Sequence, residues 1–265
     1  MSIITISRGS YSRGKEVAEK VAQQLGFECI SREVLSEASE EFNVPKIEPV
    51  RTIHDASSML DHLTLGKEGY VAYVQASLLR HFQRDNVVYH GLAGDCFAGS
   101  VSHMLKVRID AEYEDRVEFA AQREDLSHYK AWSLIEAVDK ARRQWGLHIW
   151  GMDPNDPKLY DLLINIKKLS TDDAADIICR SARLKCFQAT VESQQVIDNL
   201  LLAASVRASL VEEHPRADVT ANEGVVCIAL KGGSSSDEKE VRDIVEQIAG
   251  VEHIDIDLEP FVTPD

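Results

Sequence analysis

Residues 9–16, Gly-Ser-Tyr-Ser-Arg-Gly-Lys-Glu, carry the side chains and spacing that most directly suggest chemistry. A β-branched run over residues 3–6 precedes them and an amphipathic segment follows, which is the strand–loop–helix context of a phosphate-binding loop. Glycines let backbone N–H groups close around phosphate oxygens, and the start of the helix adds partial positive charge. In this interpretation Lys15 is a point charge for the β- and γ-phosphates. The predicted nucleotide-binding residues are Gly9, Ser10, Tyr11, Ser12, Arg13, Gly14, Lys15 and Glu16.

One position departs from the usual phosphate-loop pattern. Glu16 stands where a Ser or Thr hydroxyl normally contacts Mg²⁺, so we expect any metal to be held through water or another carboxylate. Asp110, at the end of a predicted strand, is the candidate for orienting hydrated Mg²⁺, with a helix-capping role as the equal alternative. For the loop as a whole, the alternative is a plain strand–helix turn with two convenient glycines.

Alternating strands and helices are predicted to position this loop. The β-rich runs are residues 3–6, 27–30, 86–90, 105–110 and 160–165. The helical patterns are residues 15–25, 32 onward, 66–84, 113–124, 131–145 and 170–183, with a loop over residues 146–157. This alternation indicates an α/β fold in which helices cover both faces of a parallel sheet, a three-layer arrangement.

A second domain is predicted after residue 187. Its patterns are helices over 193–213 and 237–249 and strands over 217–220, 225–230 and 251–257. These strands are too few to continue a doubly wound sheet, so we expect a first domain over residues 1–184 and a small α+β domain over residues 193–260. The linker lacks the Gly, Ser or Pro richness of a free tether. We therefore expect the small domain to dock on the first domain or on a second subunit, unless its apolar residues only fill its own core.

The composition restricts the class of protein. The 265 residues carry a formal net charge of −15, which disfavours nonspecific binding to nucleic acid or anionic membrane. The sequence has no transmembrane segment and no signal-peptide pattern, so a cytoplasmic location is expected. Five cysteines without C-x-x-C spacing suit reduced thiols rather than a disulfide framework or a zinc site.

Further stretches stand in a fixed order with the loop. They are residues 4–8 (Ile-Thr-Ile-Ser-Arg), 31–34 (Ser-Arg-Glu-Val), 87–91 (Val-Val-Tyr-His-Gly), 107–111 with 114–116, and 160–165. With these stretches, residues 1–183 resemble the cytidylate kinase-like proteins, a branch of the nucleoside monophosphate kinases with a P-loop fold. The resemblance implies ATP-dependent phosphoryl transfer with Mg²⁺, and a Glu after the Gly-basic pair is familiar in that family.

The resemblance also implies a lid that carries cations. In the cytidylate kinases an Asp-x-x-Arg stretch supplies lid arginines, and Asp139 and Arg142 fit that spacing. Arg142 and Arg143 are therefore candidate catalytic residues that would fork onto phosphate oxygens as charge builds, with Asp139 on the substrate side. A solvated charged helix face is the equal alternative.

Acceptor binding is implied for the segment after the second strand. The family commonly presents Asp-Arg there, whereas this chain has Ser31-Arg32. Arg32 is the candidate for the acceptor phosphate, and an exposed arginine after a helix cap is the alternative. A second departure is Leu92, which stands where the family usually has an arginine in a Gly-Arg-Gly turn. Asp95 is a candidate for binding a base amine or a metal-bound water, and equally a structural residue. The resemblance alone makes CMP or dCMP the expected acceptor.

The C-terminal segment resembles a BON domain over about residues 195–258. This resemblance rests on Glu223-Gly-Val-Val226, on Gly232 and on the closing Gly250-Val251 segment. BON domains are associated with ligand binding, so an unidentified ligand is expected, and a homo-oligomer is a further expectation. Two functions stay open. The chain is a nucleoside monophosphate kinase, or it is a catalytically weak nucleotide-binding regulator that signals through its C-terminal domain.

Overall fold

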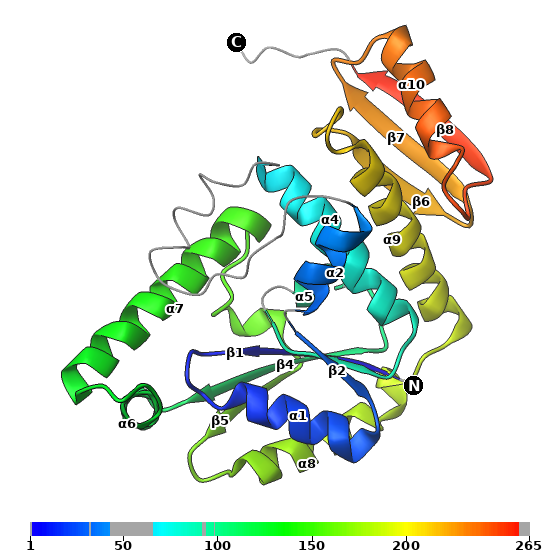
Figure 1. The fold of residues 1–265 in the computed structure, drawn as a ribbon. Helices are drawn as coiled ribbons and strands as arrows, with labels where there is room; N and C mark the ends of the chain where they lie inside the picture. Colours follow the sequence, from blue (N-terminus) through cyan, green and yellow to red (C-terminus); the bar gives the residue numbers. More distant parts are fainter. Residues whose placement is uncertain (1, 32, 43–65, 92–93, 98, 260–265) are drawn as a thin grey trace. The chain divides into compact units, whose positions relative to one another are not determined.

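A computed structural model describes residues 2–31, 33–42, 66–91, 94–97 and 99–259 (Figure 1). Its larger sheet has five parallel strands in the order β2-β3-β1-β4-β5. Their bounds are β1 Ile3–Arg8, β2 Glu28–Ile30, β3 Val87–Tyr89, β4 Met104–Ala111 and β5 Leu162–Ile166. All five strands coincide with the predicted runs to within two residues at either end. The α/β assignment with a parallel sheet is therefore confirmed.

Strand β1 lies at the centre of this sheet, and its side chains are buried on both faces. Its residues 3–7 are buried, and it pairs with β3 on one side and β4 on the other. A β-branched run without alternation is typical of such a strand. The register places Arg8 opposite Ile109, so β1 and β4 end at the same edge. The residues that follow β1 are thereby delivered to the carboxyl edge of the sheet.

Helices α1 (Gly14–Leu25) and α8 (Thr171–Ala182) pack against each other and cover one face of the sheet (Figure 1). Val17 and Val21 of α1 join Ile178 of α8 in a core shared with the strands. Gly26 ends α1 in the left-handed conformation, as its position after the last apolar residue predicts. Ser170 begins α8 with a reciprocal capping box, which confirms the predicted cap.

Helix α7 (His128–Trp150) is longer than the predicted helix over 131–145, and it follows α6 (Tyr113–Glu124). The prediction that residues 146–150 belong to a loop was wrong, because Trp145 and Ile149 extend the buried face of the helix. Ser127 accepts a hydrogen bond from the helix start, and Gly151, with φ of 69°, ends it. No helix in the described part of the chain combines the length and apolar character needed to cross a membrane.

A smaller sheet is formed by β6 (Asp218–Asn222), β7 (Val225–Lys231) and β8 (His253–Glu259) in that order. Strands β6 and β7 are antiparallel and joined by Glu223 and Gly224, both at positive φ as in a tight hairpin turn. Strand β8 is parallel to β7 after the crossover helix α10 (Ser235–Val245). The apolar core of this sheet includes residues of α10 and of the preceding helix α9 (Val191–Leu210).

Contacts divide the chain into two compact units. Counting only described residues, the first unit takes those within 2–33 and 84–190, and the second takes 34–42, 66–83 and 191–259. Helices α2 (Glu33–Glu41) and α4 (Gly66–Gln83), which precede β3 in the chain, therefore group with the C-terminal sheet. Helix α4 packs along α9, where the Gln83 amide donates to Asp198 at 2.7 Å. Beyond the end of α9, Glu212 accepts from the Tyr73 hydroxyl at 3.2 Å.

Candidate functional site

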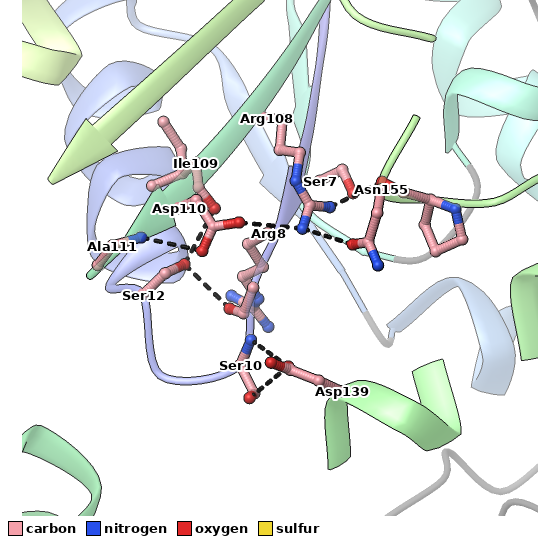
Figure 2. A network of polar contacts seen from close by, with 12 residues as sticks. Ser7, Arg8, Ser10, Ser12, Arg108, Ile109, Asp110, Ala111, Asp139 and Asn155 are labelled. Atoms are coloured by element: carbon pink, nitrogen blue, oxygen red, sulfur yellow. Dashed lines mark hydrogen bonds and ion pairs between the residues drawn. The ribbon is translucent and has the colours of Figure 1, made fainter. Parts of the chain in front are cut away.

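The phosphate-loop candidate joins the carboxyl end of β1 to the first turn of α1 (Figure 2). The Gly9 N–H donates to the Ile109 carbonyl at 3.1 Å. The buried Ser12 hydroxyl lies 2.9 Å from the Gly9 carbonyl and 3.1 Å from that of Ile109. Tyr11 and Arg13 have φ of 57° and 60°, a left-handed conformation that is costly for residues with side chains. The loop is thus curled tightly against β4 at the start of a helix.

Close packing explains the two glycines that bound this loop. A Cβ atom on Gly9 would lie 2.6 Å from a carboxylate oxygen of Asp110. A Cβ atom on Gly14 would lie 2.7 Å from the Cβ of Arg8. Both separations are well inside the roughly 3.5–4 Å at which non-bonded heavy atoms attract each other. Glycine is therefore required at these two positions because the loop lies very close to the ends of β4 and β1.

Lys15 and Glu16 leave the first turn of α1 toward different surroundings. The Lys15 side chain is 61% exposed, and its Nζ lies 3.5 Å from Glu19. Glu16 accepts a hydrogen bond from the Thr171 hydroxyl at 2.7 Å and pairs with Lys20 at 3.3 Å. The bond from Thr171, helped by Lys20, holds the pKa of the Glu16 carboxyl below its ordinary value. Glu16 therefore links α1 to α8, and its expected contact with a nucleotide stays a prediction.

Asp110 lies near the end of β4, beside Gly9, and its carboxylate is surrounded by donors (Figure 2). Arg108 Nη2 donates to Oδ2 at 3.1 Å, and the Ala111 N–H donates to Oδ1 at 2.9 Å. Arg116 Nη1 lies 3.7 Å from Oδ1. The two guanidinium groups neutralise the carboxylate and fix its direction at the edge of the sheet.

The donor set around Asp110 tests the expected metal site. Among the described residues, no group of three or more His, Cys, Asp or Glu side chains is arranged to hold a metal ion. Mg²⁺ usually keeps several waters and takes only one or two carboxylates together with substrate phosphates. Since both oxygens of Asp110 already accept hydrogen bonds, the residue suits a water-mediated contact with an ion that arrives with a nucleotide. The capping alternative fails because Glu112 is the N-cap of α6.

Arg116 of α6 connects the loop to α7. Only 6% of this residue is exposed, and its Nε donates to the Ser10 carbonyl at 2.7 Å. Its Nη2 donates to the Ser10 hydroxyl at 2.9 Å and also contacts the Asp139 carboxylate. Asp139 Oδ1 accepts from the Ser10 N–H at 3.1 Å and from its hydroxyl at 2.6 Å (Figure 2). Because an unpaired buried charge is costly, these partners stabilise the guanidinium where it lies.

The two predicted lid arginines have different partners. Arg142 Nη1 donates to the Arg8 carbonyl at 3.1 Å, immediately before the loop. Arg143 binds Asp153 Oδ2 through two nitrogens, Nε at 2.8 Å and Nη2 at 2.7 Å. Hydrogen bonds from the Asn155 backbone and from Arg143 lower the pKa of Asp153. The structure therefore brings Arg142 to the loop and directs Arg143 to the segment after α7.

The acceptor-side candidates follow β2 and β3 in the chain. Arg32 and Leu92 lie outside the described residues. For Asp95 the structure gives the backbone, which belongs to the short helix α5 (Gly94–Phe97). The acceptor roles of Arg32 and Asp95 therefore stay predictions.

Sequence reasoning assigned no role to Arg108 and Arg116, which complete the polar network. Besides Asp110, Arg108 donates to the Pro154 carbonyl at 2.8 Å and to Asn155 Oδ1 at 2.9 Å. Its guanidinium carbon lies 5.9 Å from the centre of the Tyr160 ring. The signal was available, because an arginine inside an apolar strand or on the apolar face of a helix must find polar partners.

Comparison with known proteins agrees with this geometry. The profile of the Cytidylate kinase-like family matches residues 3–168. The cytidylate kinase of Pyrococcus horikoshii is 35% identical over 74 residues, which are 28% of this chain and 38% of that protein. The cytidylate kinase of Methanopyrus kandleri is 30% identical over 104 residues, 36% of this chain and 54% of that protein. The matched parts thus span about two fifths to one half of these curated relatives.

A solved structure shares the fold. An uncharacterized protein from Eubacterium ventriosum is 19% identical, with a TM-score of 0.53 over 69% of this chain and 98% of that one. The family match covers more than half of the chain and includes the loop, β4, α6 and α7, which together form the polar network. This chain belongs to the Cytidylate kinase-like family.

Proposed function

We propose that this chain is an ATP-dependent nucleoside monophosphate kinase with CMP or dCMP as its acceptor. The observation that carries the proposal is the glycine-bounded loop at the carboxyl edge of a parallel sheet, in contact with Arg116 and Asp139 and with Arg142 bonded to Arg8 immediately before it. Ligands of open α/β sheets bind outside the carboxyl ends of the strands. Family membership supports a nucleotide kinase, whereas the choice of acceptor rests on the resemblance to cytidylate kinases.

The proposed reaction needs positioning and charge neutralisation rather than a covalent enzyme intermediate. An oxygen of the acceptor phosphate attacks the γ-phosphorus, the bond to the β–γ bridging oxygen breaks, and ADP leaves. Loop N–H groups and Lys15 hold the donor phosphates, while Arg142 stabilises charge on the transferring group. Asp110 would hold a hydrated Mg²⁺, which when bound would supply charge neutralisation of the donor phosphates. Arg143 contributes only after it leaves Asp153.

The acceptor side is proposed to follow β2, with Arg32 on the acceptor phosphate and Asp95 near its base. The family match ends at residue 168, so the C-terminal sheet lies outside it. We propose a functional division into a kinase-like domain over residues 1–184 and a BON-like module over residues 193–260. The module would bind its own, unidentified ligand.

A coupled assay of ADP formation tests the catalytic proposal. The full chain is incubated with ATP and, in turn, CMP, dCMP, UMP, AMP and GMP. We expect the fastest turnover with CMP or dCMP. Failure to form ADP with any of these acceptors, in a preparation that binds ATP, would contradict catalysis.

A nucleotide-binding regulator is the second candidate. It is favoured by Leu92, an apolar side chain that cannot donate a hydrogen bond, and by a C-terminal sheet beyond the family match. Calorimetric titration with ATP and with CMP, followed by a turnover measurement on the same preparation, separates the two functions. Binding without turnover favours the regulator, and turnover favours the kinase.

A further inference from the structure

The Asp139 carboxylate accepts hydrogen bonds from Ser10 of the phosphate-loop candidate (Figure 2). Its Oδ1 accepts from the Ser10 N–H at 3.1 Å and from the Ser10 hydroxyl at 2.6 Å. Its other oxygen contacts the Arg116 guanidinium. A backbone N–H, a hydroxyl and a guanidinium are the donor types that proteins use for phosphate. The carboxylate therefore marks a position with the chemistry of a phosphoryl-oxygen site.

The donors at this position are buried and held independently of Asp139. Ser10 is almost fully buried, and Arg116 also bonds the Ser10 carbonyl at 2.7 Å and faces Asp110. Asp139 itself is only partly buried. Removal of its carboxylate would therefore leave Ser10 and Arg116 in place.

We propose that Ser10 and Arg116 form an anion subsite, which Asp139 fills until a phosphoryl oxygen displaces it. The inference rests on phosphate binding by the loop and adds the position of one oxygen and the group that competes for it. A carboxylate and a phosphoryl oxygen are both negatively charged acceptors, so they exclude each other from the same two Ser10 donors. Filling the subsite releases a contact between the loop and α7.

Calorimetric titration of the full chain with inorganic tripolyphosphate tests this exclusion. Asp139→Asn keeps the side-chain shape but removes the competing charge, so we expect it to bind tripolyphosphate about fivefold more tightly. Glu136→Gln is the matched control, because it removes one charge from the same helix, and Glu136 has no hydrogen bond to the described loop residues. The control should change affinity less than about twofold. Unchanged or weaker binding by Asp139→Asn, or an equal gain in both variants, overturns the inference.

Lys15→Ala distinguishes failure of the subsite from failure of the proposed function. If the unmodified chain binds neither tripolyphosphate nor ATP, both proposals fail. If it binds both and Lys15→Ala weakens them, but Asp139→Asn binds no better, only the subsite is wrong. Ser10→Ala in the Asp139→Asn background removes one subsite donor, and we expect it to weaken binding about threefold. Thermal melting of each variant verifies folding.

A second measurement needs no substitution. All three tryptophans of the chain, Trp132, Trp145 and Trp150, belong to α7. Release of Asp139 should therefore change tryptophan fluorescence when the unmodified chain is saturated with tripolyphosphate. An unchanged spectrum at saturation overturns the displacement.

Discussion

The two sheets of this protein distribute their polar residues differently. In the five-stranded sheet all strands run the same way, so the residues after β1 and at the end of β4 meet at one edge. Ser10 and Asp110 share Arg116 there, although Ser10 follows β1 and Asp110 belongs to β4. In the three-stranded sheet, exposed Asp218, Asp255 and Asp257 alternate along the strands with more buried residues. A parallel sheet thus gathers polar chemistry at an edge, and the smaller sheet spreads it over a face.

The charged groups of the two regions are also held differently. Arg108 and Arg116 are buried and engaged by several partners, which makes each guanidinium part of the local structure. In the C-terminal region, the ion pair of Arg242 with Glu238 and the contact of His253 with Asp255 are exposed. Removing a charged side chain should therefore lower stability or activity in the first region and change them hardly at all in the second.

The largest difference between the two regions is expected in enzymatic turnover when a lysine is replaced. Lys15→Ala should lower kcat/KM for ATP-dependent turnover about 10²–10³-fold, because it removes the charge that we propose to contact the donor phosphates. Lys239→Ala in α10 removes the same charge from the C-terminal region and should leave turnover unchanged. Steady-state assays of both variants provide the measurement. Equal losses would mean that net charge, rather than the loop, governs activity.

The next largest difference between the regions is expected in the free energy of unfolding when a buried or an exposed arginine is replaced. Arg116→Met leaves Asp139 without its cation and Asp110 with Arg108 alone, and we expect it to lower the free energy of unfolding by about 2–4 kcal/mol. Arg242→Met breaks an exposed pair with Glu238 and should cost no more than about 0.5 kcal/mol. Urea unfolding followed by tryptophan fluorescence reports the first variant, and far-UV circular dichroism reports both. Comparable losses would break the distinction between the regions.

Tyr73 provides a smaller effect inside the second unit. Tyr73→Phe removes its hydrogen bond to Glu212 and should lower the free energy of unfolding by about 1 kcal/mol. Burial raises the pKa of Tyr73 from the ordinary tyrosine value to about 12, and the nearby Glu212 carboxylate contributes to the increase. Because the folded state retains the proton longer, the associated stability is complete below about pH 10 and is lost between about pH 10 and 12.

Alkaline titration by ultraviolet absorbance checks this shift. The titration step near pH 12 should be missing from Tyr73→Phe. The control is Tyr129→Phe, at an exposed position of α7 in the first unit, and it should keep that step. Persistence of the high step in Tyr73→Phe would place it on another tyrosine.

The smallest contrast is expected where the regions are alike. Ser170 with Asp173 begins α8, and Ser234 with Asp237 begins α10, each as a reciprocal capping box. Hydrogen bonds from these serines lower the pKa of both aspartates. Their stabilising effect is therefore present above the ordinary aspartate pKa and is lost as pH falls through the lowered values. Ser170→Ala should raise the pKa of Asp173 toward its ordinary value, and Ser234→Ala should do the same for Asp237; NMR titration measures both. A pKa change at only one of the two caps would reveal a difference between the regions.

Much of the fold was predictable because its signals are local. The apolar runs located all five strands of the larger sheet, and the glycine spacing located the loop. The end of α7 was missed because Gly146 and the prolines after it indicated a loop, while burial of Trp145 and Ile149 decided the outcome. The contact of Asp139 with Ser10 joins residues 129 positions apart, which no local pattern encodes.

The packing of α4 against α9 could not be predicted from the sequence either, because it also joins distant segments. Helix α4 has buried residues around its whole circumference, so its pattern indicates burial without indicating the partner. Residues 193–213 were predicted as helical, but their apolar positions were equally compatible with packing on their own sheet. Only the folded chain shows which helix occupies the remaining face.

This packing of α4 on α9 also affects the order in which the chain can fold during synthesis. The ribosome makes α4 first and then everything from β3 to α8 before α9 emerges. Until then the surface of α4 that α9 covers has no partner, and nascent apolar surface of this kind is what chaperones bind. A polypeptide interrupted after residue 190 would possess every strand of the larger sheet yet retain this exposed helix surface. Synthesis of α9 is therefore a condition for burying α4, which precedes it in the chain by several strands and helices of the larger-sheet region.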